Sequence, residues 1–280
     1  MRHILIPTDF SENAKNAIAY ALNLFKDKET TFYFLHAYQD EIYQDQDLLE
    51  TATLSEITES ICKTSGEKLE DILNFVNRNF ENDKHSFYTL AINNMLVEAA
   101  DKVVNDFDID LIIMGTKGQS NDNRVVFGSH TLQVLKYVEC PVLSIPSGYT
   151  FTPVNKILFP SDFLIPYKQR ELKLVKNIAK ANHANINLLY ISTMNHLSVR
   201  QKNNLRDIEE TLKVNTAFHI SNTKNVVPTI IETIKNDNIN MLVMVKTRHS
   251  FLENILFKAK IDTLSLNLDI PFLALQNTNR

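Results

Sequence analysis

Three of the five glycines in this 280-residue chain lie close together, at Gly115, Gly118 and Gly128. Ser129 follows directly, so the spacing is Gly-x2-Gly-x9-Gly-Ser. Glycine lets a backbone adopt a positive φ or approach a ligand closely. Backbone N–H groups and a hydroxyl at a helix N-terminus bind phosphate oxygens. The cluster therefore predicts a phosphate-binding loop.

The residues around this loop fit that prediction. Residues 109–114 are an apolar run typical of a buried strand, and residues 129–138 have the pattern of a helix. Lys117 and Arg124 are the cations of the loop, and each either screens phosphate charge or is a solvated surface residue. The loop lacks the Gly-Lys-Ser/Thr ending of a Walker motif, and no general base is evident. We expect binding, with slow hydrolysis at most.

The chain repeats itself. Residues 4–10 return as residues 157–163, and residues 109–114 return as residues 239–244. A repeat of this length is a domain and not a solenoid unit. We therefore expect one domain over residues 1–147 and a second over residues 154–280. The offset between the copies falls from 153 to 130 residues, so the second copy is shorter.

Short β-rich runs alternate with helical stretches in each copy, which predicts an α/β fold with a parallel sheet and helices on both faces. In the first copy we expect strands near 3–7, 31–37, 85–91, 110–114 and 142–145, and helices near 11–26, 48–80, 93–106 and 129–138. Ligands of such sheets bind at the carboxyl ends of strands, where the strand order reverses.

Composition narrows the function. The net charge of −4 argues against a nucleic-acid partner, and no apolar run is long enough to cross a membrane. The start of the chain lacks the apolar region of a signal peptide. Cys62 and Cys140 are the two cysteines, too few for a disulfide framework. We expect a cytoplasmic protein.

Taken together, these patterns resemble the universal stress protein family. The resemblance rests on residues 6–11, the strand ending at His36-Ala37, residues 110–115, the glycine spacing and residues 140–143. It implies two tandem domains, each a five-stranded parallel sheet of order 3-2-1-4-5, paired through their last strands. Many members of the family bind ATP or AMP, and others bind no nucleotide.

The resemblance also implies a stress-response regulator whose first domain binds ATP or AMP, with or without Mg²⁺; the sequence itself predicts no metal site and no catalytic residue. The implied binding residues are Thr8, Asp9, Ala37, Met114, Gly115, Gly118, Gly128, Ser129 and His130. Asp9 would lie near the adenosine, and the backbone of Ala37 would bind the adenine edge. Asp9 can also cap the helix that begins near Ser11, and His130 can be an ordinary first-turn residue. His36 is expected to be a partly buried strand residue and not a catalyst.

The second copy is an internal control. A shift of 130 residues puts Val245, Arg248 and Lys258 opposite the three glycines, and Ala259 opposite Ser129. The second copy is therefore predicted to have lost the phosphate site and to act as a structural partner. Alternatively, Arg248 and Lys258, with Lys246, bind another anion.

Residues 29–62 contain acidic side chains and no Lys or Arg. This stretch, which includes most of the 40–63 insertion, is either a solvated surface or a lid or partner surface beside the nucleotide. Two other functions stay open: a nucleotide-independent interaction module of the same fold, and an enzyme such as an ATPase. The enzyme would need a base and a metal ligand, and Asp9 is the acid near the glycines.

Overall fold

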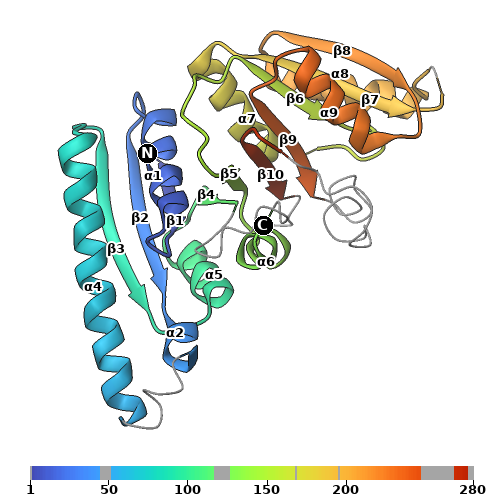
Figure 1. The fold of residues 1–280 in the computed structure, drawn as a ribbon. Helices are drawn as coiled ribbons and strands as arrows, with labels where there is room; N and C mark the ends of the chain where they lie inside the picture. The colour runs from blue at the N-terminus through green and yellow to red at the C-terminus, as the bar shows by residue number, and fades with distance from the viewer. Residues whose placement is uncertain are drawn as a thin grey trace. The chain divides into compact units, whose positions relative to one another are not determined.

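The structure is a computed structural model that describes residues 2–44, 52–116, 127–167, 169–194, 196–246 and 268–276. The chain divides into two compact units, Met1–Phe151 and Thr152–Arg280, which are described separately (Figure 1). No helix in these described ranges is both long and apolar enough to cross a membrane.

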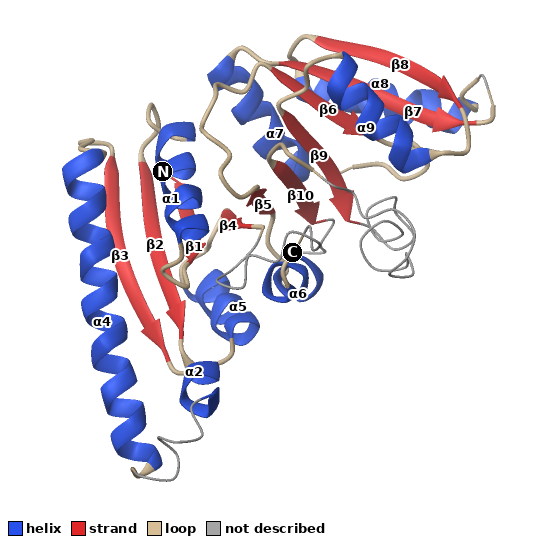
Figure 2. Ribbon diagram, viewed as in Figure 1, coloured by secondary structure: helices blue, strands red, loops and turns tan. Residues whose placement is uncertain are grey.

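The first unit is a parallel sheet of order β3-β2-β1-β4-β5 with helices alongside it (Figure 2). Its elements are β1 (Arg2–Pro7), α1 (Glu12–Leu24), β2 (Thr30–Ala37), α2 (Gln39–Gln44), α4 (Leu54–Asn79), β3 (His85–Ile92), α5 (Leu96–Asp106), β4 (Leu111–Gly115), α6 (Ser129–Tyr137) and β5 (Val142–Ile145). The predicted fold class and strand order are confirmed.

The second unit repeats the same order, β8-β7-β6-β9-β10, again with parallel neighbours. Its elements are β6 (Lys156–Pro160), α7 (Gln169–Asn182), β7 (Asn185–Ser192), α8 (Val199–Leu212), β8 (Thr216–Asn222), α9 (Val226–Asn236), β9 (Met241–Lys246) and β10 (Phe272–Gln276). The pairing of the two domains through their last strands stays a prediction.

The central strands of the first unit, β1 and β4, each contain an apolar run. Residues 4–6 of β1 and residues 111–113 of β4 are completely buried. Continuous apolar runs of this kind are typical of parallel strands that are covered on both sides. The pattern fixes β1 and β4 side by side in the middle of the first sheet, with register Ile4 opposite Leu111.

The predicted start of the helix near residues 48–80 is wrong. α4 begins at Leu54, where Thr53 and Glu56 form a capping box: the Thr53 hydroxyl accepts from the Glu56 N–H, and the Glu56 carboxylate accepts from the Thr53 N–H. Such a box satisfies two helix-end donors at once and so fixes the boundary. A separate short helix, α2, comes earlier, and its Ile42 packs in a small apolar cluster.

Candidate functional site

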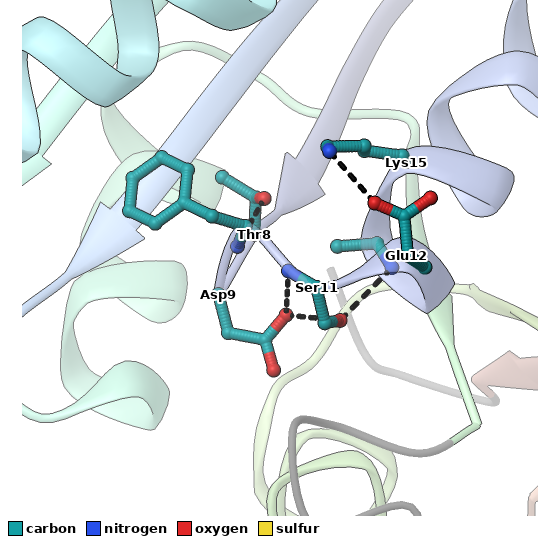
Figure 3. Close-up of polar contacts among 7 residues, drawn as sticks. Thr8, Asp9, Ser11, Glu12 and Lys15 are labelled. Atoms are coloured by element: carbon teal, nitrogen blue, oxygen red, sulfur yellow. Dashed lines mark hydrogen bonds and ion pairs between the residues drawn. The ribbon is translucent and has the colours of Figure 1, made fainter.

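The turn between β1 and α1 is held by its own side chains (Figure 3). The Thr8 N–H donates to the Leu35 carbonyl of β2 at 2.8 Å, and the Thr8 hydroxyl accepts from the Phe10 N–H at 3.0 Å. Phe10 has a φ of 64°, a left-handed conformation that is uncommon for a bulky side chain. These bonds fix the backbone where β1 ends.

Asp9 does not cap helix α1 directly, which corrects the expected capping role. The cap is Ser11, whose hydroxyl accepts from the Ala14 N–H at 3.2 Å. The Asp9 carboxylate accepts from the Ser11 hydroxyl at 2.6 Å and from the Ser11 N–H at 3.1 Å. Asp9 therefore orients the capping residue, and the helix begins at Glu12.

His36 joins the end of β2 to the same turn. Its Nδ1 lies 2.8 Å from the Thr8 carbonyl oxygen, which can only accept, so Nδ1 carries the hydrogen. The ring is 3% exposed and lies 4.4 Å, between centroids, from the ring of Phe10. Its Nε2 lies 3.1 Å from the Glu41 carboxylate of α2. His36 is thus a strand residue that bonds the turn, and it is buried where partial burial was expected.

Ala37 ends β2 beside the end of β1. The Leu35 carbonyl faces β1, where it accepts from the Thr8 N–H, and the Tyr38 N–H faces β3, where it donates to the Ile92 carbonyl. Backbone groups alternate along a strand. The N–H and C=O of Ala37 are therefore turned toward the side of β1, one residue beyond the point where that strand stops.

The glycine loop is closed at its base by hydrogen bonds. The Gly128 N–H donates to the Thr116 carbonyl at 2.7 Å, and the Thr131 hydroxyl donates to the Gly115 carbonyl at 3.0 Å. Thr116 and Thr131 are both buried. The sequence pattern alone did not point to these two threonines, although a threonine in the first turn of the helix after the loop was a usable signal.

For two of the glycines the structure excludes a positive φ as the reason for glycine, and close approach to a ligand stays a prediction. Gly115 is the last residue of β4, and Gly128 has a φ of −61°, so neither has a left-handed backbone. Among the residues that the structure describes, the glycine with a positive φ is Gly148, at 70°. The Gly128 N–H, expected to face phosphate, is used by Thr116. Gly118, with Lys117 and Arg124, lies outside the described residues.

The N-terminus of α6 has no side-chain cap and no acidic residue in its first turn. Its first intrahelical bond runs from the Leu132 N–H to the Gly128 carbonyl. The N–H groups of Ser129 and His130 precede that bond, and both residues are exposed. Helix N-termini of this kind favour anions, since their N–H groups and dipole point at the ligand.

Helix α2, at the start of the acidic insertion, lies beside this N-terminus. The His130 Nε2 is 3.6 Å from the Asp40 carboxylate, and both side chains are partly exposed. Residues 45–51 of the insertion lie outside the described ranges. Its role as a lid stays a prediction.

The remaining predicted residues lie at one edge of the sheet. Thr8 and Asp9 follow β1, Ala37 ends β2, and Met114, which is buried, and Gly115 end β4. These are the carboxyl ends of neighbouring parallel strands, and the strand order reverses between β1 and β4. Crevices at such a reversal bind ligands in open α/β sheets. Across the described ranges, no three His, Cys, Asp or Glu side chains gather as metal ligands would.

The second unit has the same turn, but different side chains bond to it. Phe163 has a φ of 54°, its N–H donates to the Ser161 hydroxyl, and the Asp162 carboxylate accepts from the Leu164 N–H. Here, however, α8 donates side-chain amides to the turn. Gln201 bonds the Asp162 carbonyl at 2.7 Å, and Asn204 of the same helix bonds the Phe163 carbonyl at 2.8 Å.

The second unit differs at the glycine positions as well. Val245, opposite Gly115, is buried in β9, and Lys246 ends that strand. Arg248, Lys258 and Ala259 lie outside the described residues. The loss of the phosphate site in this unit stays a prediction.

Comparison with known proteins supports the family. The model of the universal stress protein family matches residues 1–146. Two curated relatives from Methanocaldococcus jannaschii are universal stress protein MJ0577, 25% identical over 51% of this chain and 93% of its own, and universal stress protein MJ0531, 27% identical over 51% and 80%.

A solved structure matches the whole length of the chain. The universal stress protein from Archaeoglobus fulgidus aligns over 99% of this chain and 98% of its own, with 16% identity and a TM-score of 0.69. That likeness concerns the fold, whereas the family model matches more than half of the residues. The chain belongs to the universal stress protein family.

Proposed function

We propose that the first unit binds ATP or AMP at the carboxyl ends of β1, β2 and β4 and acts as a regulatory protein with little or no hydrolysis. The observation that carries the proposal is the exposed, uncapped N-terminus of α6, next to the strand reversal. Nucleotide binding occurs among relatives: one universal stress protein was solved in complex with cAMP.

Each predicted residue has a role in this proposal. The backbone of Ala37 would bind the adenine edge, and Thr8 and Asp9 would lie along the adenosine. The N–H groups of Ser129 and His130 would face the phosphates, with Met114, Gly115, Gly118 and Gly128 lining the approach. Mg²⁺ would be held by the phosphates of ATP and by water, because Mg²⁺ keeps several waters when it binds phosphates.

Isothermal titration with ATP and with AMP tests the proposal, using Asp9→Ala and its counterpart Asp162→Ala. Asp9→Ala removes a carboxylate at the proposed site, and we expect ATP affinity to fall about tenfold, the size of a lost charged hydrogen bond. Asp162→Ala removes the same contact in the second unit and should leave affinity unchanged. Failure of the unchanged protein to bind either nucleotide would refute the proposal.

A nucleotide-independent scaffold is the second candidate. It is favoured by the second unit, where Gln201 and Asn204 occupy the turn that corresponds to the proposed site. Mass spectrometry of the purified protein distinguishes the two, since copurifying adenine nucleotide argues against a scaffold. ATP turnover lost in Asp9→Ala would instead favour an enzyme.

A further inference from the structure

Aromatic side chains form a continuous row on the first unit, away from the candidate nucleotide site. Tyr33 of β2 stacks on Tyr88 of β3 with centroids 5.5 Å apart and an interplanar angle of 19°. Phe107, just after α5, lies 4.9 Å from Tyr33, and His3 lies 5.9 Å from it on the other strand. His3 and Phe107 belong to the amino ends of β1 and β4, whereas the candidate nucleotide site lies at the carboxyl ends.

The outer rings of this row are uncovered. Tyr88 is 55% exposed and Phe107 is 38% exposed, although β3 and α5 are well-formed elements. Tyr33, on which Tyr88 stacks, is 7% exposed. Exposed aromatic rings that gather on one surface mark interaction sites.

Carboxylates flank the row at a helix end that disfavours them. Asp106 is the last residue of α5, and Asp108, with a φ of 48°, follows Phe107. Both are exposed, and neither makes an ion pair within the part of the chain that the structure describes. A helix C-terminus carries a partial negative charge and favours cations. Helix α5 carries one lysine, Lys102, about one turn before Asp106. Strand β1 carries Arg2, whose guanidinium interacts with Asp110.

The second unit shows that the fold does not need these residues. Asn187 and Ala217 occupy the register positions of Tyr33 and Tyr88, because Leu158 pairs with Asn187 as Leu5 pairs with Tyr33. The C-cap of α9 is Asp237 where α5 has Phe107. No aromatic side chain stands at any of these three positions.

The acids are likewise replaced by neutral amides. Asn236 is the last residue of α9, and Asn238 has a φ of 53°, close to that of Asp108. Asn240 likewise stands where the first unit has Asp110, and here the hydrogen bond to the first strand is kept. The Asn240 side chain accepts from the Lys156 N–H at 3.0 Å, as the Asp110 carboxylate accepts from the His3 N–H. The turn thus forms with neutral amides at Asn236 and Asn238 and one acid, Asp237, between them, so the fold does not require Asp106 and Asp108.

We propose that this surface, made of Tyr33, Tyr88, Asp106, Phe107 and Asp108 and called here the aromatic-acidic surface, binds the lysine or arginine side chains of a basic segment of a partner protein. Aromatic faces attract such cations, and the flanking carboxylates complement their charge. The exposed rings supply the apolar contact for the side-chain stems.

Fluorescence anisotropy tests the proposal with a labelled twelve-residue peptide of alternating glycine and lysine or arginine, and with a matched peptide of glycine and glutamate. In low salt, we expect Tyr88→Ala to weaken binding of the basic peptide about fivefold, as for an exposed cation–π contact. The double variant Asp106→Asn with Asp108→Asn should weaken it by at least as much, and salt should weaken it in the unchanged protein.

The matched control removes two charges elsewhere. Glu67→Gln with Glu70→Gln changes two exposed acids of α4 and should alter peptide affinity less than twofold. If Tyr88→Ala unfolds, the asparagine variant still decides, because asparagine occupies both positions in the second unit. ATP affinity should be the same in all variants, so this proposal can fail while the nucleotide proposal stands.

Three results would overturn the proposal. The unchanged protein could bind the basic peptide no better than the acidic one. The Tyr88 and asparagine variants could bind like the unchanged protein. The α4 control could lose as much affinity as the asparagine variant, which would show a general attraction of an acidic protein for a basic peptide.

Discussion

The turn after β1 in the first unit and the turn after β6 in the second have the same backbone and different surroundings. Phe10 and Phe163 are both left-handed, and an aspartate accepts a hydrogen bond from the N–H two residues later in each. In the first unit a histidine from the neighbouring strand bonds the turn. In the second, two amides from helix α8 do so.

This comparison separates folding requirements from candidate functions. A feature present in both units, such as Asp9 and Asp162, is explained by the turn and is weak evidence for a ligand. A feature of one unit on a shared backbone, such as the aromatic-acidic surface, is not explained by folding. The uncapped N-terminus of α6 cannot be compared in this way, because the corresponding residues of the second unit lie outside the described ranges.

The largest expected effect concerns the two cores. Leu5 and Leu158 are matched strand residues, and both are completely buried. Replacing either by alanine should lower the free energy of unfolding of its own unit by about 2–5 kcal/mol, because a cavity remains. Hydrogen exchange measured separately on β1 and β6 peptides checks this. If one substitution lowered the protection of both units equally, the two units would not unfold separately, and the comparison between them would fail.

A smaller effect is expected at the glycine loop. Gly128 has an ordinary φ, so Gly128→Ala should cost about 1 kcal/mol or less of stability, the difference between the two residues at an N-cap. If phosphate lies against this position, the added methyl group should lower ATP affinity about tenfold, or about 1.4 kcal/mol.

Gly66→Ala is the control for that change, since it adds a methyl group to an open position on α4. It should leave ATP affinity unchanged when both variants are measured by calorimetry. Unaltered affinity in Gly128→Ala would place the phosphates elsewhere.

The smallest effect is a pH dependence of the stability of the first unit. Burial lowers the pKa of His85, at the start of β3, against the opposing effect of its bond to the Phe25 carbonyl. The unfolded chain therefore binds the proton more readily than the folded one, and stability falls as the pH drops through the ordinary histidine range. Thr216 begins the matching strand β8, and its side chain does not titrate in this range.

Hydrogen exchange of β3 and β8 at pH 7.5 and pH 5.5 checks this, with His85→Gln as the control. We expect β3 to lose protection at the lower pH in the unchanged protein and not in the variant. Equal loss in β3 and β8 would assign the effect to other groups.

Much of the fold could be predicted from the sequence. The five strands of the first unit lie within one or two residues of their expected bounds, because buried parallel strands leave uninterrupted apolar runs. The helix expected near residues 48–80 failed because polar residues cover the boundary, and only the Thr53–Glu56 spacing marks it. Capping signals are local and need to be sought separately from hydrophobic periodicity.

For the candidate site, the sequence predicts which residues lie at the strand ends, but it does not predict their hydrogen bonds. Residue types placed Asp9 near a helix start, but the choice of Ser11 as the cap depends on hydroxyl geometry. The aromatic-acidic surface was missed entirely. Tyr33, Tyr88 and Phe107 come from three elements and meet only through strand register and helix packing.

The bond between Gly128 and Thr116 has a consequence for protein engineering. It joins the two ends of the glycine loop at 2.7 Å, so the strand before the loop and the helix after it are anchored independently of what lies between. Doubling the length of a flexible loop costs only about 0.6 kcal/mol in closure entropy. A reporter peptide inserted between Thr116 and Gly128 should therefore leave the fold of the first unit unchanged.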